Sequence, residues 1–150
     1  MNQVLSAEEL LTEAELQQVR EAIGAAELRT SGEIRVHLED HIEEDVLDHA
    51  AFIFEELGMH RTEDRNGVLI YLSVADRKLA VIGDVGINQR VPENFWNDVV
   101  GLLKLHLAAG RPAEGLVEAV HMVGEKLRAQ FPLKPDDRDE LPNEISFGRR

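Results

Sequence analysis

The chain contains no cysteine among its 150 residues. Disulfide bonds, thiol catalysis and thiolate metal sites are therefore excluded. No apolar run approaches the roughly 20 residues that are needed to cross a bilayer, so we expect no membrane insertion. The first residues carry no basic segment and turn acidic at Glu8 and Glu9. This is not the pattern of a signal peptide, and we expect a cytoplasmic protein.

Basic residues are also scarce, with 16 lysines and arginines against 29 acidic residues and a net charge of −13. Such a charge repels phosphodiester backbones and anionic lipid headgroups. Because no basic patch interrupts it, we expect no binding to nucleic acid or to a membrane surface. Cations and basic protein partners are favoured instead. The alternative is that the acidity serves only solubility.

The length and a hydrophobic content of 43% suit a single domain with one core. We expect an N-terminal extension over residues 1–11 and a compact α/β domain over residues 12–132. An acidic tail that contains proline follows over residues 133–150. Its composition predicts an extended or partly disordered segment on the surface.

Apolar residues at helical spacing predict four helices, over residues 12–28, 43–58, 92–108 and 113–130. Thr12 followed by Glu15 has the spacing of a capping box, which marks the start of the first helix. Pro92 suits the first turn of the third helix.

Three strands are expected between these helices. Residues 33–39 alternate between apolar and polar side chains, which predicts a half-exposed strand. Residues 68–72 and 79–82 are continuously apolar, as in strands that are covered on both faces. The helix between the first two strands implies that they are parallel, and the short polar turn before the third implies a hairpin. The fold class is therefore α/β, a three-layer α/β/α sandwich with a small mixed sheet and helices on both faces.

This topology brings the start of the first strand, the start of the second and the end of the third to one edge of the sheet. The polar residues expected at that edge are Ser31, Glu33, Asp64, Asn66 and Asp84. Carboxylate, amide and hydroxyl oxygens are ligands for hard cations. We therefore predict a calcium or magnesium site formed by these five side chains.

Each of these residues also has a simpler role available. Asp64 or Asn66 can cap a loop, and Asp84 can cap the turn that follows it. Glu33 can form a surface ion pair with Arg65, which would contribute little stability. The six histidines show no paired metal-ligand spacing, and the sequence contains neither a serine elbow nor a phosphate-binding glycine loop.

Several short segments, taken in order, resemble the TPM domain family. They are Ser31-Gly32-Glu33-Ile34-Arg35-Val36, Arg65-Asn66-Gly67-Val68-Leu69-Ile70, Arg77-Lys78 and Gly83-Asp84-Val85-Gly86-Ile87, followed by Trp96. The resemblance extends over roughly residues 16–132. It implies an α/β/α sandwich around a small sheet, in agreement with the pattern of helices and strands.

The resemblance also suggests functions. Calcium binding is attributed to some members and acid phosphatase activity to the plant type, and members include thylakoid-lumen photosystem II repair proteins and an animal modulator of acetylcholine receptors. The family's polar loops correspond to Ser31 and Glu33, to Asp64 and Asn66, and to Asp84. The sequence shows no signal peptide, transmembrane helix or glycine-rich tail of the kind often joined to the domain, so we expect no thylakoid or envelope role.

Three functions remain open at this point. The first is a cation-binding domain of regulatory or interaction type. An alternative is a metal-assisted phosphatase, in which Asp84 beside a metal would serve as the nucleophile. Another alternative is a module whose protein partner binds the acidic face or the tail.

Overall fold

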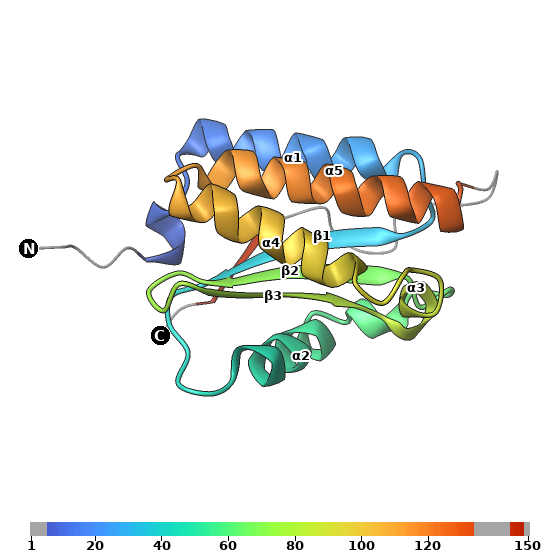
Figure 1. The fold of residues 1–150 in the computed structure, drawn as a ribbon, viewed down its shortest axis with the longest axis horizontal. Helices are drawn as coiled ribbons and strands as arrows, with labels where there is room; N and C mark the ends of the chain where they lie inside the picture. Colours follow the sequence, from blue (N-terminus) through green and yellow to red (C-terminus); the bar gives the residue numbers. More distant parts are fainter. Residues whose placement is uncertain (1–5, 134–144, 149–150) are drawn as a thin grey trace, which may run out of the picture.

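The protein is described by a computed structural model over residues 6–133 and 145–148. A four-stranded sheet in the order β3-β2-β1-β4 lies between two layers of helices (Figure 1). In chain order the elements are η1 (Ala7–Glu9), α1 (Glu13–Glu27), β1 (Glu33–Glu39), α2 (Val46–Glu56), η2 (Met59–Arg61), β2 (Gly67–Ser73), β3 (Lys78–Gly83), α3 (Val85–Asn88), α4 (Phe95–Ala108), α5 (Pro112–Gln130) and β4 (Ile145–Gly148).

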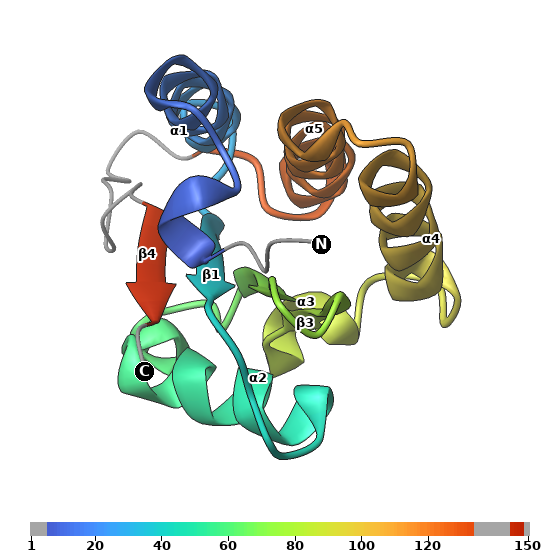
Figure 2. The ribbon, with the colours of Figure 1, turned by 90° about the vertical axis from the view of Figure 1, so that its left-hand side faces the viewer.

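The predicted three-layer arrangement is confirmed. Helices α1, α4 and α5 cover one face of the sheet, and α2 covers the other (Figures 1 and 2). β1 pairs with β2 in parallel, and β2 pairs with β3 as an antiparallel hairpin, as expected. β2 is buried along its whole length, in agreement with its continuously apolar sequence. No helix in the described part of the chain is both long and apolar enough to cross a membrane.

Local signals place most helix boundaries well. The capping box is present, because Glu15 N donates to Thr12 Oγ1 at 3.1 Å and Thr12 N donates to Glu15 Oε1 at 2.9 Å. The third expected helix begins at Phe95 rather than at Pro92. The short helix α3 was not predicted. It forms because the Asp84 carboxylate accepts a hydrogen bond from Val85 N at 2.8 Å, so that Asp84 is its N-cap.

The prediction of a tail without regular structure is wrong for residues 145–148, which form β4. This strand lies beside β1 and runs parallel to it, with Val36 opposite Ile145 (Figure 2). Ile145 is only 4% exposed and belongs to the core beneath α1 and α5. The exposed edge of β1 thereby gains a partner, which satisfies its backbone groups. The rest of the predicted tail, residues 134–144 and 149–150, lies outside the described residues.

The described part of the N-terminal extension also packs on the domain. Ala7 and Leu11 are buried in the same core as α1. Ala7 N donates a hydrogen bond to Asp40 Oδ1 at 2.6 Å, which joins this segment to the loop after β1.

β1 is not half-exposed, as its alternating pattern had suggested. Its apolar residues face α1 and α5, but Glu33, His37 and Glu39 on the other side are also buried. The alternation is real, and the expected exposure is wrong because β4 and α2 cover the polar side. These polar groups therefore need partners within the protein.

Glu39 provides the central acceptor of this buried polar side. Its Oε1 lies 3.1 Å from His37 Nε2 and 3.3 Å from His49 Nε2. His37 Nδ1 lies 2.7 Å from Ser146 Oγ of β4, and its ring stacks on Tyr71 with centroids 5.6 Å apart. Burial lowers the pKa of His37 despite the nearby Glu39 carboxylate. Burial, and then the charge of Glu39, raise the pKa of Tyr71.

We predict that β4 contributes to global stability. Ile145→Ala removes a buried side chain and should lower the free energy of unfolding by about 2–4 kcal/mol. Leu133→Ala is the matched control, because Leu133 is 47% exposed and its truncation should change stability by no more than about 0.5 kcal/mol. Urea denaturation monitored by circular dichroism measures both. Equal, small effects would show that β4 is not docked in solution.

We also predict that His37 makes stability depend on pH. Since its pKa is lower in the folded than in the unfolded state, the unfolded state binds more protons below pH 6.5. The free energy of unfolding should therefore fall on acidification below pH 6.5, by up to about 1.4 kcal/mol per pH unit from this group. Stability should be measured by denaturation between pH 7.5 and 5, which lie about 1 and 1.5 units from a normal histidine pKa. Its slope with pH should be smaller for His37→Gln than for the control His121→Gln at an exposed site. Identical slopes would contradict the prediction.

Candidate functional site

The predicted site residues lie at one edge of the sheet, where α3 is found in Figure 1. The register pairs Glu33 with Gly67 and Val68 with Gly83, so the starts of β1 and β2 and the end of β3 meet there. Asp84 N donates to Gly67 O at 2.9 Å, and Glu33 N lies 3.4 Å from Asn66 O. The topology therefore assembles the three loops that the sequence identified.

Three of the five predicted side chains contact one another. Asn66 Nδ2 donates to Ser31 Oγ at 3.2 Å, and Ser31 Oγ lies 3.5 Å from Asp64 Oδ2. Asn66 is only 1% exposed, and its backbone N–H donates to Thr62 Oγ1 at 3.1 Å. Its Oδ1 is buried and has no hydrogen-bond partner within the described ranges.

Asp84 has a different environment. Arg65 Nε and Nη2 donate to its two carboxylate oxygens at 2.7 and 2.9 Å. This bidentate pair raises the pKa of Arg65. Asp84 thus acts as the helix cap that was considered as an alternative, and Arg65 pairs with Asp84 rather than with Glu33 on the surface. The Asp84 carboxylate is therefore already bound by the Arg65 guanidinium group and by the backbone N–H of Val85.

Glu33 is 2% exposed and lies at the first position of β1. Among the residues that the structure describes, Glu33, Asp64 and Asp84 do not bring one carboxylate oxygen each within 4.8 Å of one another. The compact part of the predicted site is therefore Ser31, Asp64 and Asn66, with Glu33 on the neighbouring strand and Asp84 in its own ion pair.

Gly86 fixes the position of the Asp64 loop. Its N–H donates to Arg65 O at 2.8 Å. A Cβ atom at this position would overlap the backbone oxygen of Asp64 and would lie 2.6 Å from that of Arg65. Only glycine allows α3 to approach the loop this closely. Arg65 itself has a positive φ of 51°, so the turn before β2 is tight.

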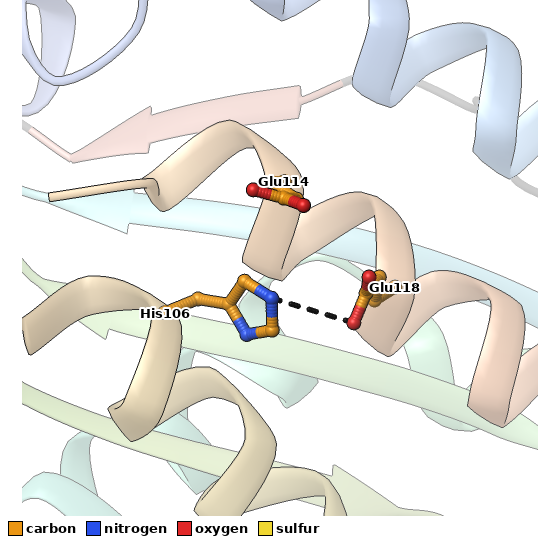
Figure 3. Close-up of side chains that lie close together, drawn as sticks. All are labelled: His106, Glu114 and Glu118. Atoms are coloured by element: carbon orange, nitrogen blue, oxygen red, sulfur yellow. Dashed lines mark ion pairs between the residues drawn. The ribbon is translucent and has the colours of Figure 1, made fainter. Parts of the chain in front are cut away.

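A second cluster of ligand-type side chains lies at the other end of the helical layer, where α4 ends and α5 begins. His106 Nε2 is 3.4 Å from Glu118 Oε2, and one carboxylate oxygen of Glu114 completes a group within 4.8 Å (Figure 3). His106 Nδ1 donates to Leu102 O at 3.0 Å within α4. Gly115 lies against the base of this side chain, because a Cβ there would be 2.7 Å from His106 Cβ.

This second cluster was not predicted from the sequence. Its one histidine meets two glutamates from the next helix, so the chain shows no pair of histidines at metal-ligand spacing there. The available signals were the four-residue spacing of Glu114 and Glu118, which places them on one helix face, and the short turn at Gly110 and Arg111. That turn makes α4 and α5 antiparallel neighbours, but only packing decides which faces meet.

Comparisons with known proteins agree with this architecture. The structure is similar to the NMR structure of BA42 protein from the psychrophilic bacterium Bizionia argentinensis, with a TM-score of 0.87 and 45% sequence identity over 94% of this chain and 97% of that one. The N-terminal domain of a protein from P. gingivalis shares the fold at a TM-score of 0.65 and 18% identity, over 87% and 96% of the two chains. A search of curated proteins found no match.

The sequence pattern of the TPM domain matches residues 4–126, which is most of the chain. The match includes all five predicted site residues and the three residues of the second cluster, His106, Glu114 and Glu118. The chain belongs to the TPM domain family.

Proposed function

We infer that this TPM domain binds a divalent cation, calcium in preference to magnesium, at the edge of the sheet next to Ser31, Asp64 and Asn66. One observation carries the proposal. The side-chain oxygen of Asn66 is buried and has no hydrogen-bond partner among the described residues. Leaving such a group unpaired costs about 1–3 kcal/mol, which favours a bound state in which this oxygen turns toward a cation.

A small rearrangement makes the three side chains a set of oxygen ligands. In the structure the Asn66 amide directs Nδ2, not Oδ1, toward Ser31 Oγ, at 3.2 Å. A half-turn of the amide would direct Oδ1 toward Ser31 Oγ and would turn Nδ2 into the buried position that Oδ1 now occupies. Ser31 Oγ is in turn next to the Asp64 carboxylate. A cation would then meet one charged and two neutral oxygens.

The donor set and the surroundings favour calcium. Calcium accepts six to eight oxygens in irregular geometry and takes backbone carbonyls and water, whereas magnesium demands a near-ideal octahedron. One carboxylate among the direct side-chain ligands implies weak binding, with a dissociation constant on the order of 10⁻⁴ to 10⁻³ M. The net charge of −13 raises the local cation concentration. The nearby positive charge of Arg65 is neutralised by Asp84.

The alternatives from the sequence gain less support. A phosphatase that uses Asp84 as its nucleophile would first have to break a bidentate ion pair and a helix cap. Binding of a protein partner to the acidic surface or the tail remains a prediction. The proposed role is therefore a cation-binding domain of regulatory or interaction type, without turnover.

Calcium titration of the metal-free protein should move the backbone amide resonances of the loops that contain Ser31, Asp64 and Asn66. Asp64→Asn removes the charged ligand at nearly constant size and should weaken calcium binding by about tenfold or more. Asp48→Asn is the matched control, since this exposed aspartate in the first turn of α2 loses the same charge away from the site. No shifts in these loops at several millimolar calcium, above the expected dissociation constant, would refute the proposal.

Gly86→Ala tests whether the loop geometry matters for binding. The new methyl group must displace the Asp64 carbonyl, so we expect a loss of about 1–3 kcal/mol of stability and weaker calcium binding. Gly101→Ala is the control, because nothing lies within 4 Å of a Cβ at this exposed position of α4. It should stabilise the protein by about 0.5–1 kcal/mol. Thermal denaturation and the same calcium titration report both effects, and wild-type binding by the Gly86 variant would exclude a role for the loop.

A further inference from the structure

The geometry points to a second metal site, formed by His106, Glu114 and Glu118, that takes a first-row transition-metal cation such as Zn²⁺. This site joins the end of α4 to the start of α5 (Figure 3). It is independent of the proposed calcium site, which lies at the opposite end of α4, beside α3 (Figure 1).

The histidine is oriented for ligation. His106 Nδ1 donates its hydrogen to Leu102 O at 3.0 Å, which leaves Nε2 as the nitrogen facing the two carboxylates. A backbone carbonyl that holds one ring nitrogen while the other binds metal is the usual arrangement of histidine ligands. The ring is mostly buried, with its side chain 14% exposed, and Gly115 allows it to lie close against α5.

The distances suit a metal better than a direct hydrogen bond. His106 Nε2 and Glu118 Oε2 are 3.4 Å apart, beyond the normal range for an N–H···O bond. Two ligands on a tetrahedral zinc with bonds of about 2.1 Å are separated by about 3.4 Å. Glu114 and Glu118 are about half-exposed, with side-chain exposures of 52% and 46%, so both carboxylates have room to turn toward an ion; for Glu114 this would replace its ion pair with Arg111.

The donor chemistry selects the metal. One imidazole nitrogen and two carboxylates suit zinc, manganese, cobalt or iron, whereas calcium and magnesium prefer oxygen alone. Three protein ligands leave at least one coordination position for water or for a group from a partner. The metal would also join α4 to α5, so binding should stabilise the folded state.

Zinc titration of the metal-free full-length chain, followed by isothermal calorimetry and by the ¹⁵N shifts of the histidine rings, tests the inference. We expect a saturable event that shifts the Nε2 resonance of His106, raises the Tm and is not reproduced by calcium. Glu118→Gln should weaken zinc binding by about tenfold or more. Because Glu118 is half-exposed, this variant should remain folded. His106→Gln should weaken binding to a similar or greater extent.

His121→Gln is the matched control, because His121 is exposed on α5 and lies outside the cluster. It should bind zinc like the wild type. The inference is overturned if zinc does not bind, if binding survives both His106→Gln and Glu118→Gln, or if His121→Gln reduces it equally. In the first case the His106–Glu118 contact is an ion pair and nothing more. Asp64→Asn should leave zinc binding intact, which separates this site from the calcium site.

Discussion

The parallel pairing of β1 with β2 is the constraint on which the rest of the structure depends. Its register sets Glu33 opposite Gly67, and this alignment brings Ser31 beside Asp64 and Asn66. It also directs the apolar residues of β1 toward α1 and α5. A shift of the β1–β2 register by one residue would turn Val36 and its apolar neighbours toward α2. The polar side chains of β1 would then face the main apolar core. Core packing and the assembly of the sheet-edge loops are thus set by the same hydrogen-bonded ladder.

The two candidate cation sites offer different kinds of ligand atom, because one is built from loops and the other from helices. At the sheet edge, loops offer hydroxyl, amide and carboxylate oxygens near backbone carbonyls, an environment for a hard cation. At the end of α4, side chains from two rigid helices offer a nitrogen and two carboxylates with no loop carbonyl among them. Packing of Gly115 against His106 sets the second site, whereas packing of Gly86 against the Asp64 loop sets the first. A close glycine contact therefore positions the candidate ligands at each end of the domain.

The polar side of β1 connects the C-terminal strand to the domain. His37 contacts Ser146 of β4 on one side and Glu39 on the other, and Glu39 also meets His49 of α2. This chain of hydrogen bonds crosses from the edge strand to the helix that covers the second face of the sheet. Removal of β4 would leave His37 without its Ser146 partner and would uncover the core around Ile145. The last strand is accordingly part of the fold as well as an addition to its edge.

The sequence by itself determined the four longer helices, the first three strands, their order and the convergence of three polar loops. Local periodicity, the capping box at Thr12 and the length of each connection carry that information. It did not determine β4, because a short strand after a long acidic segment has no distinctive pattern of its own. It also did not determine that Arg65 would form an ion pair with Asp84 or that His106 would lie beside Glu114 and Glu118. The distances between these residues depend on how the helices, strands and loops pack against one another. Only the tertiary structure determines that packing.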